Sequence, residues 1–155
     1  MIFTKSQIES RISHVACRIS HIELSQIANR ISHITNRKKM HNFKELIVWQ
    51  KARKIVKDVY LLTKKYPKEE LFGLTQQIRK AAVSIPSNIA EGAGRGTDAD
   101  FAHFLDFANG SACEVETQLY LSLDLEYISQ AEFDDVNYKL QDIEKLVFNL
   151  KKKLV

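Results

Sequence analysis

Apolar side chains recur every three or four residues between positions 43 and 66. This spacing places them along one face of a helix, and Pro67 ends the helix because its ring blocks a further turn. The opposite face is strongly basic, with little more than Asp58 as an acidic residue. The residues expected to face the core are Val48, Ala52, Ile55, Val59, Leu62 and Tyr66.

A second periodic stretch begins at residue 71 and reaches the glycines Gly92, Gly94 and Gly96. Pro86 lies inside it and removes one backbone hydrogen bond, so we expect one kinked helix. Gly92 or Gly94 is expected to end this helix in the left-handed conformation. The expected core face consists of Leu71, Leu74, Ile78, Ala81 or Ala82, Ile85 and Ile89.

Two capping sequences indicate where a third and a fourth helix begin. Thr97 and Asp100 have the spacing of a capping box, with Asp in place of the usual Glu. Ser129 and Glu132 form the usual version. The third helix is expected to bury Phe101, Phe104, Leu105, Ala108, Ala112, Val115, Leu119 and Leu123. The fourth is expected to bury Phe133, Val136, Leu140, Ile143, Val147, Leu150 and Leu154.

These patterns predict an all-α fold, because no stretch shows the alternation typical of a strand. Four long helices with short connections favour an antiparallel up-down-up-down four-helix bundle, with a kink in the second helix at Pro86. The bundle domain is expected to cover residues 40–155.

Residues 1–39 form a leader of a different kind, in which the phrase RISH occurs three times. Its isoleucines follow a heptad spacing with one slip. Three interpretations stay open: a transit peptide, a helix that docks on a partner or on itself, and a start-site artefact with Met40 as the true start. The repeat itself explains its histidines without a metal-binding role, namely His14, His21 and His33.

Charge is distributed unevenly along the 155 residues, although the formal net charge is only +4. The leader carries seven basic and two acidic residues, so the bundle itself is close to neutral. Residues 44–68 hold eight basic and two acidic side chains, whereas residues 97–150 hold two basic and twelve acidic ones. A bundle with one basic and one acidic side is suited to an anionic partner or to joining copies of itself.

Little in the composition indicates catalysis. Cys17 and Cys113 lie too far apart in sequence for a CxxC metal site, and Cys113 is expected to be packed in the bundle. No Glu-x-x-His pair supports a di-metal site, and no nucleophile–base arrangement is suggested. No apolar run approaches the roughly 20 residues of a membrane span. We expect a non-enzymatic cytoplasmic protein without a metal or another cofactor.

The segment GAGRGT at 92–97 resembles a phosphate-binding loop only superficially, because it follows a helix and lacks the Gly-Lys-Ser/Thr ending. Arg95, next to a helix N-terminus, is nevertheless a candidate phosphate contact. Glu91 is expected to pair with Arg79 or Arg95.

Several stretches of the chain carry a resemblance to a known family. They are FKELIVWQKA at 43–52, YPKEE at 66–70, FGLT at 72–75, QIRKAAVSIPSNIAEG at 77–92 and ETQL at 116–119. Over about residues 41–155 the chain resembles the bacterial four-helix-bundle proteins encoded in intervening sequences of 23S rRNA genes. The resemblance implies a homopentameric ring without known catalysis or cofactor. A related branch, the accessory proteins of diversity-generating retroelements, is thought to bind nucleic acid and a reverse transcriptase.

The leading hypothesis is a homo-oligomer that binds structured RNA or DNA through phosphate contacts, with a protein partner such as a reverse transcriptase implied by the related branch. The alternative is a protein–protein adaptor or assembly scaffold whose basic and acidic faces serve ring formation. The candidate nucleic-acid contacts, carried over from the resemblance, are Lys51, Arg53, Lys54, Lys57, Arg79, Lys80 and Arg95.

Overall fold

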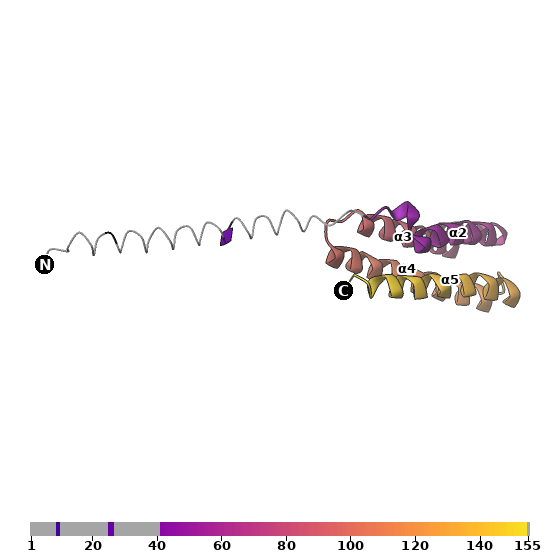
Figure 1. Cartoon of the computed structure of the whole chain (residues 1–155). Helices are drawn as coiled ribbons and strands as arrows, with labels where there is room; N and C mark the ends of the chain where they lie inside the picture. Colours follow the sequence, from indigo (N-terminus) through magenta and orange to yellow (C-terminus); the bar gives the residue numbers. More distant parts are fainter. Residues whose placement is uncertain (1–8, 10–24, 27–40, 155) are drawn as a thin grey trace. The chain divides into compact units, whose positions relative to one another are not determined.

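The computed structural model describes residues 9, 25–26 and 41–154, and within these residues the bundle contains helices and no strand. The four long helices belong to the unit Lys39–Val155 (Figure 1). They are α2 (Ile47–Leu62), α3 (Leu74–Ala93), α4 (Asp98–Asp124) and α5 (Gln130–Lys151). Three short 3-10 segments flank them, η1 (Phe43–Glu45), η2 (Thr63–Lys65) and η3 (Lys68–Phe72). The all-α, four-helix prediction is confirmed, while the interpretations of the leader and of Met40 lie outside the described residues.

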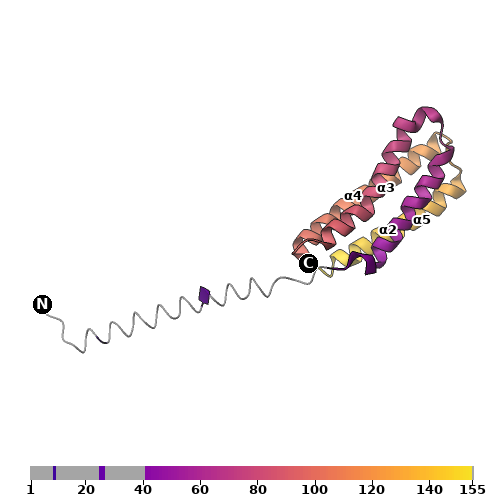
Figure 2. The ribbon, with the colours of Figure 1, turned by 90° about the horizontal axis from the view of Figure 1, so that it is seen from above.

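Each long helix packs against its neighbours in sequence, and α5 also packs against α2, which closes the bundle (Figure 2). Contacts across the α2–α5 seam show the relative direction of the two helices. Lys51, early in α2, pairs with Asp142, late in α5. Lys65, just after α2, pairs with Glu132, early in α5. The two helices therefore run in opposite directions.

The buried faces follow the hydrophobic spacing of the sequence. All six residues expected to face the core from the first helix are buried, including Ala52 and Val59 at 0% exposure. Most of the expected positions in α3, α4 and α5 are buried as well, while Phe104 and Leu150 are half-buried at the edges. Because every described helix keeps a polar outer face, none is long and apolar enough to cross a membrane.

Leu71 departs from this pattern, since its side chain is 52% exposed. It lies in η3, the 3-10 segment that precedes Gly73, and α3 begins only at Leu74. A 3-10 helix has three residues per turn instead of 3.6. The spacing of apolar residues in α3 therefore does not predict which side chains of η3 face the core. The prediction that Leu71 faces the core is therefore wrong.

The helix starts carry the caps that the sequence indicates. Ser129 and Glu132 form a complete capping box at the start of α5. At the start of α4 the Thr97 hydroxyl accepts a hydrogen bond from the Asp100 backbone N–H at 3.1 Å. In return it donates to the Asp100 carboxylate at 2.6 Å. The shorter Asp side chain thus accepts a hydrogen bond from the Thr97 hydroxyl, whereas the Glu of a usual capping box accepts one from the backbone N–H of the capping residue.

The expected left-handed glycine at the end of α3 is not found. The helix ends at Gly94 with φ −82°, a right-handed conformation, and no described glycine has a positive φ. Gly92 lies inside the helix and is buried. A Cβ atom at Gly92 would come within 2.6 Å of the Phe104 Cβ and 2.7 Å of the Phe101 ring. This glycine therefore serves close helix packing, and the prediction of a left-handed cap is wrong.

Helix α3 runs without interruption across Pro86. On the turn around the proline, the Ser87 hydroxyl donates to the Val83 carbonyl at 2.8 Å and the Asn88 amide donates to the Ser84 hydroxyl at 3.0 Å. One continuous helix is thus present, as expected from the sequence. The kink at Pro86 stays a prediction.

Candidate nucleic-acid interface

Lysines and carboxylates on the two sides of the seam between α2 and α5 form ion pairs across it. Besides the pairs that Lys51 and Lys65 make, the Lys139 ammonium donates to Asp135 at 2.7 Å and to Asp58 at 3.1 Å. Asp135 and then Asp58 raise the pKa of the Lys139 ammonium above its ordinary value. All these side chains are partly exposed, so water and salt screen the pairs and each contributes little to stability. Two of the eight basic side chains at 44–68, Lys51 and Lys65, are thus paired with carboxylates of α5 inside one bundle.

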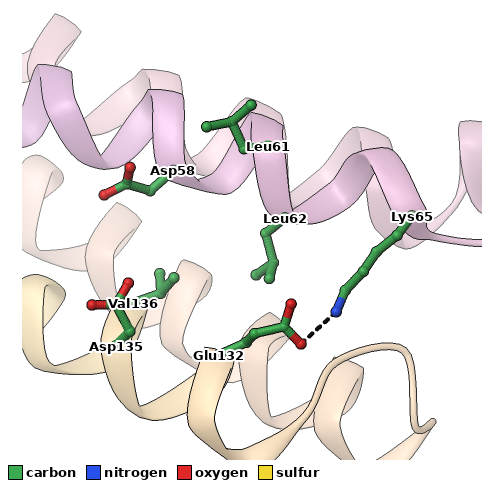
Figure 3. A pocket seen from close by; sticks show the side chains of 7 residues that line it. All are labelled: Asp58, Leu61, Leu62, Lys65, Glu132, Asp135 and Val136. Atoms are coloured by element: carbon green, nitrogen blue, oxygen red, sulfur yellow. Dashed lines mark hydrogen bonds and ion pairs between the residues drawn. The ribbon is translucent and has the colours of Figure 1, made fainter.

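A hollow of about 300 Å³ lies at one end of this seam (Figure 3). Figure 3 shows Lys65 reaching across it to Glu132, with Leu61 and Leu62 on the α2 side. Asp58 and Asp135 also line the hollow, and Lys139 contacts both of them. Among the residues that the structure describes, no group of three or more His, Cys, Asp or Glu side chains is placed to hold a metal ion.

Glu132 has the largest pKa shift of this seam. The Lys65 ammonium, followed by the backbone N–H and hydroxyl of Ser129, lowers the pKa of the Glu132 carboxyl to about 2. Because the folded-state pKa lies below the unfolded value, the stabilisation is present above about pH 4.5 and is lost as the pH falls toward 2.

We expect Glu132→Gln to be less stable than the wild type at pH 6 and to approach it as the pH falls from about 4.5 to 2. Glutamine keeps the capping geometry, so the substitution isolates the charge. Urea unfolding at a series of pH values measures the difference. A gap between the two proteins that stays constant down to pH 2 contradicts the expectation.

A larger groove of about 630 Å³ continues along the same seam. Its lining holds four lysines and two aspartates, together with the apolar side chains of Ile55 and Ile143. Lys54 and Lys57 make no ion pair or hydrogen bond with any described residue, unlike the other two lysines. We call this site the lysine groove; its lining residues are Lys51, Lys54, Ile55, Lys57, Asp58, Tyr138, Lys139, Asp142 and Ile143.

A second hollow of about 340 Å³ adjoins the lysine groove, because Lys54 lines both. Trp49 and Arg53 also line it. The Arg53 guanidinium lies 5.4 Å from the centre of the Trp49 ring, a cation–π contact. Phe43 meets the same ring edge-on at 5.0 Å. A basic side chain and an aromatic one are thus held together at the start of α2.

The seven candidate contact residues fall in different places. Lys51, Lys54 and Lys57 lie together in the lysine groove, with Arg53 beside them in the adjoining hollow. The remaining three, Arg79, Lys80 and Arg95, line neither of these two sites.

Two of these remaining residues lie in a hollow of about 500 Å³ between η3, α3 and Tyr60. The Arg79 guanidinium stacks 4.9 Å from the Tyr60 ring and donates to Thr63 Oγ1 at 2.8 Å, while Lys80 is exposed. Arg95 lies after α3, where it pairs with Glu91 and stacks 4.7 Å from the Phe104 ring. The predicted pairing of Glu91 with one of two arginines is thus confirmed for Arg95.

Tyr138 and Lys139 line the lysine groove but are missing from the residues proposed from the sequence. Tyr138 is 75% exposed and has no hydrogen bond or ring contact among the described residues. The sequence did indicate that Tyr138 is exposed, because it falls between the core positions Val136 and Leu140 and so lies outside the apolar face of the helix. An aromatic residue beside a lysine on the outer face of an acidic helix indicates a contact surface.

Cys113 is exposed, so the prediction that it is packed is wrong. It lies on the outer side of α4, where its sulfur comes within 3.9 Å of a Glu144 carboxylate oxygen. Partial desolvation, Glu144 and Glu116 raise the pKa of the Cys113 thiol above its ordinary value. The protonated thiol is therefore favoured over the nucleophilic thiolate.

Comparisons with known proteins agree on one family. The family model described as 23S rRNA-intervening sequence protein matches residues 44–149. A crystal structure of a protein of unknown function from the S23 ribosomal protein family of Bacteroides thetaiotaomicron is similar, with a TM-score of 0.62 and 27% sequence identity. The match covers 68% of this chain and 99% of that one. No curated protein matches. The family match spans most of the bundle, and the chain therefore belongs to the 23S rRNA-intervening sequence protein family.

Proposed function

We propose that this chain is a non-enzymatic, homo-oligomeric protein that binds structured RNA or DNA through phosphate contacts in the lysine groove. The observation that carries the proposal is the pair Lys54 and Lys57. Both lysines line the groove, and neither has an ion-pair partner among the described residues. Cations without partners, one helical turn apart in a concave site, are suited to neighbouring phosphates.

The other two lysines of the groove are already paired with carboxylates. Lys51 and Lys139 are held by Asp142 and by Asp58 with Asp135, so their positive charge is largely balanced. The groove lining contains no arginine, asparagine or glutamine, the side chains that most often read base edges. We therefore expect contacts to the backbone of the nucleic acid and no sequence code.

Phosphate contacts make a specific prediction about salt. Each neutralised phosphate releases counterions and contributes about 0.9 to the slope of log affinity against log salt for duplex DNA. We expect the double variant Lys54→Glu/Lys57→Glu to bind more weakly at low salt and to lose about 2 from this slope. Fluorescence anisotropy with a labelled DNA duplex, titrated at several salt concentrations with the full-length chain, measures both.

A matched control separates the groove from net charge. Lys64 and Lys68 are also exposed lysines, but neither lines the lysine groove. Lys64→Glu/Lys68→Glu changes the net charge by the same amount, and the basic leader is identical in both variants. Equal losses in the two double variants would show non-specific attraction, and an absence of wild-type binding to RNA or DNA at low salt would refute the proposal.

A second candidate function is that of an assembly scaffold, and the hollow beside η3 favours it. Phe72 is 81% exposed there, and Leu71, Tyr60 and Val83 lie around it with more than 40% of each side chain exposed. Contiguous exposed apolar surface typically marks a protein contact. We propose that a second copy of this chain covers it, in keeping with the ring that the family resemblance implies.

This candidate predicts that Phe72→Glu dissociates the oligomer. Burying a phenylalanine side chain in a subunit contact stabilises the oligomer by about 1.5–3 kcal/mol. A glutamate loses this contribution and adds the cost of burying a charge. Size-exclusion chromatography with light scattering gives the mass of each protein. We expect a smaller mass for Phe72→Glu and an unchanged mass for Lys54→Glu/Lys57→Glu. If the lysine variant dissociates instead, the lysine groove is itself the assembly surface.

A further inference from the structure

Tyr138 is the feature of the lysine groove that phosphate binding does not use. Its side chain is 75% exposed, and its ring makes no stacking or edge contact with any described residue. Ile55 and Ile143, which also line the groove, are 1% exposed. The ring therefore stands free on the rim of a site whose floor is apolar.

A free aromatic ring next to cations matches one kind of nucleic-acid site. Bases stack on aromatic side chains in proteins that bind single strands, while lysines hold the phosphates. A base inside a duplex is already covered on both faces by its neighbours, so only an unpaired base can reach such a ring. Duplex binding alone would need the lysines and would make no use of Tyr138.

The basic surface continues beyond the ring. Lys54 belongs both to the lysine groove and to the hollow that contains Trp49. Trp49 and Lys57 lie eight residues apart in α2, which corresponds to roughly 12 Å along the helix axis. That length exceeds one base step of about 3.4 Å. The surface is thus long enough for more than one nucleotide.

From this placement we infer that the lysine groove takes an unpaired segment of nucleic acid, with one base stacked on Tyr138 and its flanking phosphates on Lys54 and Lys57. The inference rests on the proposed function and names the form of nucleic acid that the site selects. In a structured RNA, the segment is a loop, a bulge or a single-stranded end.

The test compares two forms of one sequence, an unstructured fluorescein-labelled RNA oligonucleotide and the blunt duplex that it forms with its complement. Both are titrated with the full-length wild type, Tyr138→Leu and Tyr138→Phe. Leucine keeps an apolar side chain without a π face, whereas phenylalanine keeps the ring. Because Tyr138 is exposed, we expect all three proteins to have the same circular dichroism spectrum and melting temperature.

The wild type should bind the single strand more tightly than the duplex. Tyr138→Leu should weaken single-strand binding by about 5- to 100-fold, the change expected for the loss of one stacked base. Its affinity for the duplex should not change, and Tyr138→Phe should match the wild type. Emission of Trp49, the one tryptophan in the chain, should change when the single strand binds.

Other results would overturn the inference in recognisable ways. Wild-type affinity of Tyr138→Leu for the single strand would show that the ring takes no part. Equal or tighter binding of the duplex by the wild type would show that the groove does not select unpaired nucleic acid. Phosphate binding by Lys54 and Lys57 could stand in either case. A loss in Tyr138→Phe as large as in Tyr138→Leu would point to the hydroxyl and against stacking. Binding of neither RNA form at low salt would refute this inference, and it would refute the proposed function as well if the labelled DNA duplex also fails to bind.

Discussion

Replacing Gly92 by alanine is expected to lower the free energy of unfolding by about 2 kcal/mol, although alanine is the better helix former. The added Cβ atom would lie 2.6 Å from the Phe104 Cβ and 2.7 Å from the Phe101 ring. Phe101 is 1% exposed and has no room to retreat. The α3–α4 contact, the most extensive in the bundle, must therefore open. The melting temperature should fall by on the order of 10 °C.

Gly110→Ala is the matched control, because it makes the same change inside another helix. A Cβ atom at Gly110 would meet nothing within 4 Å. The substitution should stabilise the bundle by about 1 kcal/mol, since only helix propensity changes. Thermal unfolding of both variants checks the pair. Destabilisation of similar size in both would show that close packing at Gly92 does not matter.

The contrast between these glycines shows what the sequence alone could predict. The spacing of apolar residues indicated four helices and most of their buried positions, because a helix must present one face to the core. The role of Gly92 could not be predicted, since it depends on how closely α4 approaches. Glycines near the end of a helix suggest a left-handed cap. Only the positions of Phe101 and Phe104 show that Gly92 is needed because a side chain there would collide with α4.

Buried polar residues also escaped prediction. Ser122 is 0% exposed, although its hydroxyl is polar. It accepts a hydrogen bond from the Tyr66 hydroxyl at 2.6 Å and donates to the Gln118 carbonyl at 2.6 Å. The hydrogen bond from Tyr66, which lies 56 positions away in sequence, offsets the cost of burying the Ser122 hydroxyl. The apolar pattern of a single helix cannot predict such a partner.

The candidate site shows the same limit for charge. The excess of basic residues at 44–68 and of acidic residues at 97–150 was evident from the sequence, and both hypotheses used it. Which charges stay available depends on the register between two helices that are distant in sequence. That register pairs Lys51 with Asp142 and leaves Lys54 and Lys57 unpaired among the described residues. It also brings Tyr138 of α5 into the same groove.

Leu119→Ala is expected to have the largest effect on stability, about 3–4 kcal/mol. Leu119 is 0% exposed on the core face of α4, in the C-terminal part of the helix. Removing its isobutyl group costs the transfer free energy of the lost atoms, and it also leaves a cavity that helices packed on both sides cannot fill. Urea unfolding followed by circular dichroism gives the free energy, and an unchanged m-value shows that the two-state comparison holds.

Leu121→Ala tests whether the loss of unfolding free energy depends on how deeply the leucine is buried, because the same atoms are removed from an exposed site. Leu121 lies two residues further along α4, and its side chain is 46% exposed. Half of its apolar surface already meets water, and no closed cavity forms when it is shortened, so the expected loss is about 1 kcal/mol or less. Similar losses in the two variants would mean that oligomer contacts cover Leu121. In that case the difference should reappear on dilution, because dissociation of the oligomer would expose Leu121 and leave Leu119 buried.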